Sequence, residues 1–341
     1  MGQIMSALIP EGLTPADEGT HLCPPGFDGL WGDTFWVSVV DPEANVHGVN
    51  HFHLTNKGYA RLTAFYVIDG EHQWYGNKIP FDAGQGGITS FGDERISYEV
   101  VRPFEEIRIR LDGTRFAFDL TFTGRFQAFN YDNFERDPMK NVGKTAVVHG
   151  GHWEQALAVT GTVELRHGPN RGDVRQIDSF GFRDRSWSTR FSEESPWADS
   201  QRPDRQAHFW PSISLPERHI SLMGITATKT TGDQEAVVAG FASDKDGSRE
   251  VKSAEMVPVV GDLRTQSSFG YRIELADGEV LNVRTTEHYG TIKLWDRGEN
   301  DLENRFDCYE PFVAFEVEET GERGVGVCEY SVIPPRPRWQ A

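Results

Sequence analysis

The chain has 341 residues, which exceeds the usual size of a single domain and predicts two domains, each with its own hydrophobic core. Lys and Arg total 34 against 52 Asp and Glu, and the formal net charge of −18 argues against sequence-independent binding of nucleic acid or anionic membranes. Hydrophobic residues make up 38% of the chain and aromatic residues 12%, a composition that excludes a disordered protein.

Residues 1–25 form a predicted N-terminal extension. Its apolar stretch around Met5–Ile9 is short and lacks the basic start and long apolar centre of a secretory signal, and no apolar run in the chain reaches transmembrane length. The chain has three cysteines, which form neither a paired framework nor a metal-ligand spacing: Cys23, Cys308 and Cys328. We therefore expect a cytoplasmic protein without membrane insertion.

Strand signals dominate the first half of the chain. Short apolar runs with alternating residues lie at 34–40, 49–55, 60–68, 72–75, 96–102, 107–111 and 116–125. The pairs Asp69-Gly70 and Asp112-Gly113 are typical hairpin turns, so neighbouring runs should pair in an antiparallel sheet. Because closing such a sheet removes its exposed edges, residues 26–165 are predicted to form a β-barrel.

A second series of strand signals fills the rest of the chain. Its runs lie at 154–166, 175–182, 206–215, 219–228, 235–243, 251–258, 269–275, 280–287, 290–294, 312–318 and 324–333. We place the domain boundary near residue 165, which assigns residues 166–341 to a second barrel. The predicted fold class is all-β, with two antiparallel β-barrel domains in tandem. A barrel of about eight strands has room for one ligand, which indicates small-molecule binding.

Three histidines share one face of a predicted strand in the first barrel. His47, His51 and His53 all stand at odd positions, with His51 and His53 two apart, so all three side chains project in the same direction. Histidines with this spacing can bind zinc, but no further ligand stands at a diagnostic distance, and we predict no metal and no cofactor. His51 and His53 are instead predicted to line a substrate pocket, the alternative being a solvated face.

His152 and Glu154 also lie two apart on a predicted strand and so share a face. A carboxylate in this position orients an imidazole and raises its basicity, which makes the pair a candidate general base. The alternative is a hydrogen bond at the surface or between domains, because one face of a strand is normally solvated.

The most distinctive run covers residues 177–190, where Asp184 stands between Arg183 and Arg185. A guanidinium that points at this carboxylate would lower its pKa, and an ionised Asp184 serves as a base or as a counter-ion to a developing carbocation. The competing interpretation is a structural ion-pair network of Asp184 with Arg183 and Arg190.

Trp187 and Trp210 are candidate walls of the ligand cavity. An indole ring stabilises a cation through its quadrupole, although a tryptophan packed in the core needs no functional reason. Other catalytic signatures are missing from the sequence: Gly84–Gly87 is not followed by a helix signal, and no Gly-x-Ser-x-Gly elbow occurs. Nucleotide-binding and serine-hydrolase functions are therefore disfavoured.

Three segments resemble one known superfamily. Gly181–Arg190 resembles the Gly-x-Arg-Asp-His-Ser-Trp-Gly-x-Arg signature of the lipocalin-like superfamily that contains carotenoid 1,2-hydratase, kievitone hydratase and fungal lipocalin-like Diels–Alderases. His152–Gln155 resembles the Glu-Gln strand that precedes this signature, and Gly326–Tyr330 resembles its C-terminal Gly-x-x-Glu-Tyr. The resemblance implies two lipocalin-like barrels and cofactor-independent chemistry on greasy polyenes or phenolics. Arg185 departs from the pattern, because the hydratases carry a histidine there that is proposed to take part in acid–base chemistry.

Two functions follow from these observations. The first is a hydratase/dehydratase, isomerase or cyclase that acts on a terpenoid, steroid-like or polyketide substrate. Its predicted catalytic residues are Asp184, His152 and Glu154, and its predicted substrate-binding residues are Trp187, Arg185, Trp210, His51 and His53. The second is a non-catalytic carrier or sensor of a hydrophobic small molecule, which the replacement of the family histidine by Arg185 favours. The enzyme hypothesis requires that these polar groups face one enclosed cavity, and it loses its support if they point into solvent.

Overall fold

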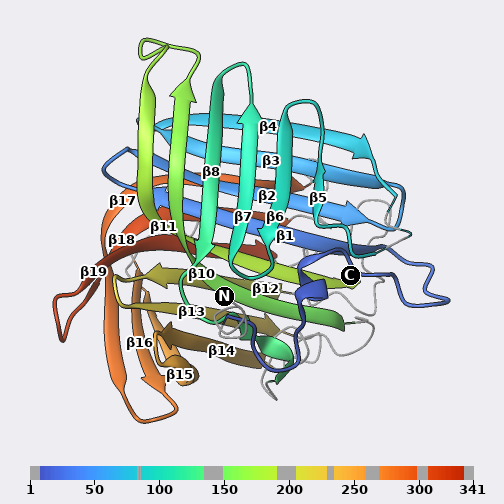
Figure 1. Cartoon of the computed structure of the whole chain (residues 1–341). Helices are drawn as coiled ribbons and strands as arrows, with labels where there is room; N and C mark the ends of the chain where they lie inside the picture. Colours follow the sequence, from blue (N-terminus) through green and yellow to red (C-terminus); the bar gives the residue numbers. More distant parts are fainter. Residues whose placement is uncertain are drawn as a thin grey trace, which may run out of the picture. The chain divides into compact units, whose positions relative to one another are not determined.

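A computed structural model of the chain describes residues 8–82, 84, 86–133, 149–189, 205–228, 234–258, 269–297 and 306–333 (Figure 1). The chain divides into two compact units. Unit 1 comprises Met1–Phe134 and His149–Arg190, and unit 2 comprises Glu135–Val148 and Phe191–Ala341. The predicted boundary near residue 165 falls in the hairpin between two paired strands of unit 1.

Unit 1 contains an antiparallel sheet and two short 3-10 helices. In chain order its elements are η1 (Pro15–Glu18), β1 (Trp31–Asp41), β2 (Val46–Thr55), β3 (Tyr59–Ile68), β4 (Glu71–Pro80), β5 (Ser90–Gly92), β6 (Ile96–Arg102), β7 (Glu106–Asp112), β8 (Phe116–Gly124), β9 (Phe129–Asn130), η2 (Tyr131–Asn133), β10 (His149–Leu165) and β11 (Val174–Thr189). The strand order is β4-β3-β2-β1-β11-β10-β8-β7-β6-β5, with β9 paired to β10, and the sheet curls without closing.

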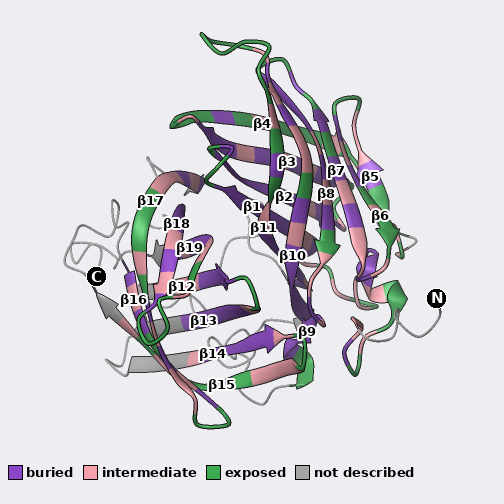
Figure 2. Cartoon of the chain, turned by 60° about the vertical axis from the view of Figure 1, so that its left-hand side comes forward, coloured by how far each residue is buried: buried purple, intermediate pink, exposed green. Residues whose placement is uncertain are grey.

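The core of unit 1 lies against one face of this sheet, as the alternation of its sequence requires. Phe35, Val37 and Val39 reach the core from β1, and the next strands contribute residues such as Phe52 and Leu62 in the same manner. The turn at Asp69-Gly70 has positive φ at both residues, which is the conformation that a two-residue hairpin needs. β1 and β2 are buried along almost their whole length, whereas β4 is largely exposed (Figure 2).

Unit 2 is a closed barrel in which each strand pairs with the next and the last returns to the first. Its strands are β12 (Arg205–Ser214), β13 (Arg218–Thr228), β14 (Gln234–Asp244), β15 (Gly247–Pro258), β16 (Phe269–Leu275), β17 (Val280–Arg297), β18 (Phe306–Val317) and β19 (Arg323–Ile333). Ile213, Leu222, Ile273, Phe315 and Tyr330 belong to its buried core. The all-β, antiparallel fold class predicted from the sequence is confirmed.

The glycines of the two signature segments have a physical reason. A Cβ added at Gly181 would overlap the backbone oxygen of Ser38 on the neighbouring strand, and one at Gly326 would overlap that of Ser212. Glycine inside a strand commonly marks such a close approach of two backbones. These two positions therefore allow tight strand packing, and neither needs a role in the chemistry.

The segment before β1 is part of unit 1 and packs against it. Leu8, Ile9 and Leu13 contact a second buried cluster that contains Trp153 and Trp187. The three cysteines are free: Cys23, Cys308 and Cys328. Among the residues that the structure describes, no helix is long and apolar enough to cross a membrane.

Candidate active site

The candidate site lies on the face of the unit 1 sheet that points away from the hydrophobic core, which we call the outer face. Side chains alternate along a strand, so His152 and Glu154 of β10 take the outer face while Trp153 and Gln155 take the core side. On β11, Asp184 takes the outer face, directly opposite Glu154 in the β10–β11 register. The two strands thereby bring all three predicted catalytic residues together.

His152 lies between the two carboxylates. Its Nε2 is 3.1 Å from Oδ1 of Asp184 and 3.3 Å from Oε1 of Glu154. The side chains of His152 and Glu154 are buried, and that of Asp184 retains 12% exposure. Asp184 is therefore the member of the cluster that a bound molecule can reach most easily.

Tyr131 completes this cluster from η2. Its ring stacks on the imidazole of His152 at 4.3 Å between centroids, with the two planes 5° apart. Its hydroxyl donates a hydrogen bond to Oε2 of Glu154 at 3.3 Å. Tyr131 thus fixes both the ring plane of His152 and the free oxygen of Glu154. Sequence reasoning missed this contact, because η2 has only three residues and follows a strand of only two.

The carboxylates determine the protonation state of His152. Burial works to lower the pKa of the imidazole, but the charges and hydrogen bonds of Asp184 and Glu154 outweigh it and raise the pKa to about 10. The imidazolium form is therefore favoured at neutral pH. His152 then serves as a hydrogen-bond donor and a fixed positive charge, and the expectation that it acts as a general base is not supported by this environment.

Two rows of residues extend this cluster across the sheet. The register aligns Asp184 with Trp36 of β1, and Trp36 with His51 of β2. The adjacent row joins His152, Ser186, Thr34 and His53. His51 and His53 therefore lie on the outer face with the catalytic candidates, about two strand spacings of 4.8 Å from Asp184 and Ser186.

Trp36 was missed by the sequence analysis although its position is informative. It stands directly opposite Asp184, and its ring makes an edge contact with Phe182 at 6.0 Å. Cross-strand neighbours have Cβ atoms about 4.5–5.5 Å apart, so the side chains of Trp36 and Asp184 start from adjacent positions on the outer face. The alternation of side chains within the predicted strand 34–40 puts Trp36 on the face opposite to Phe35 and Val37. The pairing of β1 with β11 cannot be read from the sequence.

Arg185 and Trp187 lie on the core side of β11, away from Asp184. Arg185 donates hydrogen bonds to the backbone oxygens of Thr34 and Gly19 at 2.7 Å, and its guanidinium lies 3.4 Å from the ring centre of Phe35. Trp187 stacks on His21 at 3.5 Å. Neither predicted substrate-binding residue shares a face with the His152 cluster.

The expected ion pairs between Asp184 and its arginine neighbours are wrong for Arg183 and Arg185. Arg183 binds both carboxylate oxygens of Glu18 at 2.8 and 3.1 Å and the side-chain oxygen of Gln155 at 2.6 Å. Residues adjacent in a strand point to opposite faces, which separates both guanidinium groups from Asp184. Arg190, the third expected partner, lies outside the described residues.

Two further features complete the description of the predicted site residues and of unit 1. Trp210 belongs to β12 of unit 2, where it pairs in register with Glu329. A cavity of about 440 Å³ in unit 1 is lined by polar and charged residues such as Arg95, Arg110 and Asp119, and it includes none of the predicted site residues. Of the predicted site residues, those that share the outer face of unit 1 are therefore His152, Glu154, Asp184, His51 and His53.

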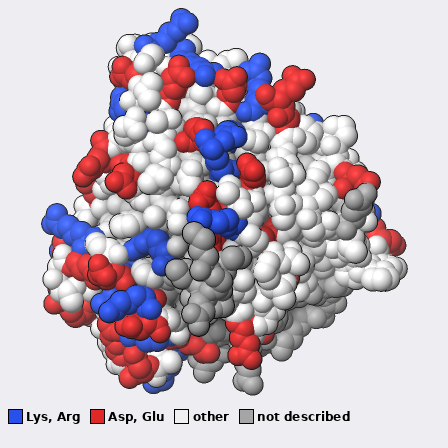
Figure 3. All heavy atoms as spheres, in the orientation of Figure 1, with Lys and Arg blue, Asp and Glu red and all other residues white. Residues whose placement is uncertain are grey.

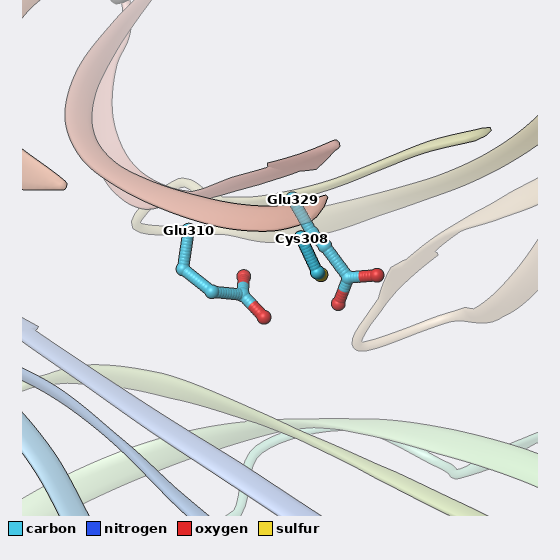
Figure 4. A group of neighbouring side chains, drawn as sticks. All are labelled: Cys308, Glu310 and Glu329. Atoms are coloured by element: carbon cyan, nitrogen blue, oxygen red, sulfur yellow. The ribbon is translucent and has the colours of Figure 1, made fainter. Parts of the chain in front are cut away.

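Among the described residues, one group of His, Cys, Asp or Glu side chains is close enough to share a metal ion. It consists of Cys308 and Glu310 of β18 and Glu329 of β19, all in unit 2 (Figure 4). Their ligand atoms lie within 4.8 Å of one another.

A curled antiparallel sheet followed by a closed eight-stranded barrel defines a tandem, lipocalin-like β-protein. Within this class, the chain belongs to the family described as "Domain of unknown function (DUF7064)", whose sequence profile matches residues 14–334. No curated protein sequence matches the chain.

Solved structures with known names share the fold over almost the whole chain. An AttH-like protein of Nitrosomonas europaea has 16% identity and a TM-score of 0.57, with 95% of this chain and 98% of that chain covered. Kievitone hydratase of Nectria haematococca has 15% identity and a TM-score of 0.52, with 92% and 90% covered. CghA bound to Sch210972 has 9% identity and a TM-score of 0.55, with 96% and 97% covered. These similarities confirm the predicted superfamily resemblance at the level of fold.

Proposed function

We propose that this protein is an enzyme that acts on a hydrophobic small molecule by acid–base and cation-stabilising chemistry, of the hydratase/dehydratase, isomerase or cyclase type. The observation that carries the proposal is the buried cluster of His152, Glu154 and Asp184 on the outer face of unit 1. A hydratase and a protein crystallised with a small molecule share the fold, which supports this class of function.

Asp184 is the proposed catalytic residue. Asp184 lies 3.1 Å from Nε2 of His152 and is the most exposed member of the cluster, and in its ionised form it can take a proton from carbon or face a carbocation. His152 and Glu154 are proposed positioning residues. Asp184 and Glu154 keep the imidazole protonated, Tyr131 orients its ring, and His152 directs one oxygen of Asp184.

Trp36 is the proposed cation-stabilising group. Its position opposite Asp184 places an indole beside the carboxylate, so that a positive charge developing on the substrate meets a π face and an anion together. This role was predicted for Trp187, which the fold places on the other side of the sheet. His51 lies next to Trp36 and is a proposed polar contact for the substrate.

A carrier or sensor is the second candidate, and one observation favours it. Arg185 stands where the hydratases carry a histidine, and here it binds backbone oxygens on the core side of the sheet. This position therefore supplies no acid or base to the outer face. If the remaining cluster is structural, the protein binds its ligand without changing it. We expect the protein in the cytoplasm in either case, in line with its free cysteines.

The substitution Asp184→Asn separates these functions. It keeps the shape of the side chain and removes the charge, so turnover should fall by a factor of about 100 or more while ligand affinity changes little. Asp178→Asn is the matched control, because Asp178 lies on the same strand and is exposed. The measurement is conversion of a panel of terpenoids, polyketides and phenolics by mass spectrometry, together with ligand affinity and melting temperature.

Each outcome of this experiment is informative. Full turnover in a stably folded Asp184→Asn protein removes Asp184 from the mechanism. Tight binding of a panel member without conversion by the wild type favours the carrier. A large loss of stability with unchanged turnover per folded molecule identifies the cluster as structural, with a cost of about 3 kcal/mol when a buried charge loses its partner.

A further inference from the structure

Unit 2 contains a second cluster of ionisable side chains, which the proposed function does not use. Val313 and Phe315 of β18 point into the barrel core, so Cys308 and Glu310, at even positions, project from the other side of the same strand. On β19, Cys328 and Tyr330 belong to the core, and Glu329 between them projects outward. The three side chains thus leave the barrel wall on one side (Figure 4).

The strand register places the two carboxylates opposite each other. Tyr309 pairs with Tyr330 and Phe312 with Val327, and the same register sets Glu310 against Glu329. Like charges that face each other across an antiparallel pair are destabilising. Glu310 is fully buried and Glu329 is half-buried, so a cation between them would be largely shielded from solvent.

Cys308 adds a third potential ligand. Its side chain is buried and its sulfur lies beside the two carboxylates. A cation among the three groups would therefore meet two carboxylates and one thiol, and a thiol that coordinates a metal ion is deprotonated outright.

We propose that Cys308, Glu310 and Glu329 form a binding site for a thiophilic divalent cation, of which zinc is the best match. The three ligand atoms lie within 4.8 Å of one another, and small side-chain rotations bring them to the about 2.0–2.3 Å that zinc needs from oxygen and sulfur. Calcium and magnesium select oxygen ligands and do not suit the thiolate.

The composition of the site sets its character. Three protein ligands leave the fourth position of a tetrahedral zinc ion open, which is typical of sites that bind a water molecule or a substrate atom. Two of the ligands, Cys308 and Glu310, lie two residues apart on β18, and the third, Glu329, lies on the neighbouring strand β19. This spacing differs from the usual sequence motifs for zinc, so the sequence alone predicted no metal.

The test uses the full-length protein, purified without a histidine tag and stripped of metal. Titration with Co²⁺ should produce the charge-transfer absorption of a cobalt–thiolate bond at one equivalent, and competition with Zn²⁺ should abolish it. Cys308→Ser and Glu310→Gln each remove a direct ligand and should weaken zinc binding by about 100-fold or more. Loss of an outer-shell partner alone can cost that much affinity. Cys328→Ser is the matched control, since Cys328 is equally buried but points into the barrel.

Thermal stability gives a readout that a folding defect cannot imitate. Zinc should raise the melting temperature of the wild type and of Cys328→Ser, but not that of Glu310→Gln. The proposal is overturned if the wild type binds no stoichiometric zinc, or if Cys308→Ser binds it as tightly as the wild type does.

Discussion

An imidazole held between two carboxylates carries a charge that a solvated histidine loses near neutral pH. In this protein Asp184 and Glu154 raise the pKa of His152 to about 10, against an ordinary value of 6.5. His152 is therefore a fixed positive charge at pH 7, in contact with both carboxyl groups. The ionised form of Asp184 is the one that a base or a cation-stabilising group requires.

This charge state predicts how stability depends on pH. Because folding raises the pKa of His152, its contribution to the free energy of unfolding is fully present below about pH 6.5 and is lost as the pH rises toward about 10. The loss over this window should amount to several kcal/mol at most. Urea unfolding between pH 6 and 10 measures it. In His152→Gln the slope should be much shallower, and parallel slopes in the two proteins would show that His152 does not titrate in this way.

The sequence predicted which face of the sheet some site residues take, but not which residues lie next to them. The i, i+2 spacing of His152 and Glu154 correctly indicated one shared face, because alternation is a local property of a strand. The same rule separates Asp184 from Arg185 and Trp187, which the sequence analysis had grouped by proximity along the chain. Trp36 could not be assigned to the site from the sequence, because its neighbour Asp184 lies almost 150 positions away on β11.

At the level of elements, η1 is held to the sheet by a buried ion pair. Glu18 accepts two hydrogen bonds from Arg183 and a third, at 2.5 Å, from the backbone N–H of Phe104. The guanidinium of Arg183 also lies 4.7 Å from the ring centre of Trp153. One side chain of a four-residue helix thus joins β11 and the loop before β7, which is why the N-terminal segment packs as part of unit 1.

Removal of Glu18 should therefore cost far more than removal of a surface carboxylate. Glu18→Ala leaves the guanidinium of Arg183 buried without its partner, and the free energy of unfolding should fall by about 3–5 kcal/mol. Glu106→Ala is the control, because its bond of 2.7 Å to Arg102 lies at an exposed site and should be worth about 1 kcal/mol or less. Equal losses in the two variants, measured by urea unfolding, would contradict the anchoring role of Glu18.

The elements themselves were largely predictable, and their pairing was only partly so. Alternating apolar residues and Asp-Gly turns identified hairpins such as β3–β4, since both signals lie within a few residues. The pairing of β1 with β11 joins segments about 140 residues apart and leaves no local signal. For the same reason, residues 1–25 read as an extension in the sequence, although Glu18 is among the most buried carboxylates of unit 1.

For the whole molecule, the net charge of −18 is the property with the widest reach. Acidic side chains are interspersed with basic ones over the face shown in Figure 3. Among the described residues, surface ion pairs such as that of Arg175 with Asp69 join side chains of opposite charge. Such pairs contribute about 0–1 kcal/mol each. The excess of acidic residues remains after pairing, so self-repulsion opposes the compact state at neutral pH.

Salt should therefore stabilise this protein at pH 8. An increase in ionic strength from about 0.01 to 0.15 M shortens the Debye length from about 30 to 8 Å, which screens repulsion between distant charges more than it weakens the close pairs. The melting temperature should rise, by roughly 2–4 °C for each kcal/mol of repulsion removed. At pH 5, near the sequence pI of about 5.0, the net charge is small and the same addition of NaCl should leave the melting temperature unchanged or lower it, because only the attractive pairs remain to be screened. A rise of equal size at both pH values would assign the effect to preferential exclusion of salt from the protein surface, and would contradict the electrostatic explanation.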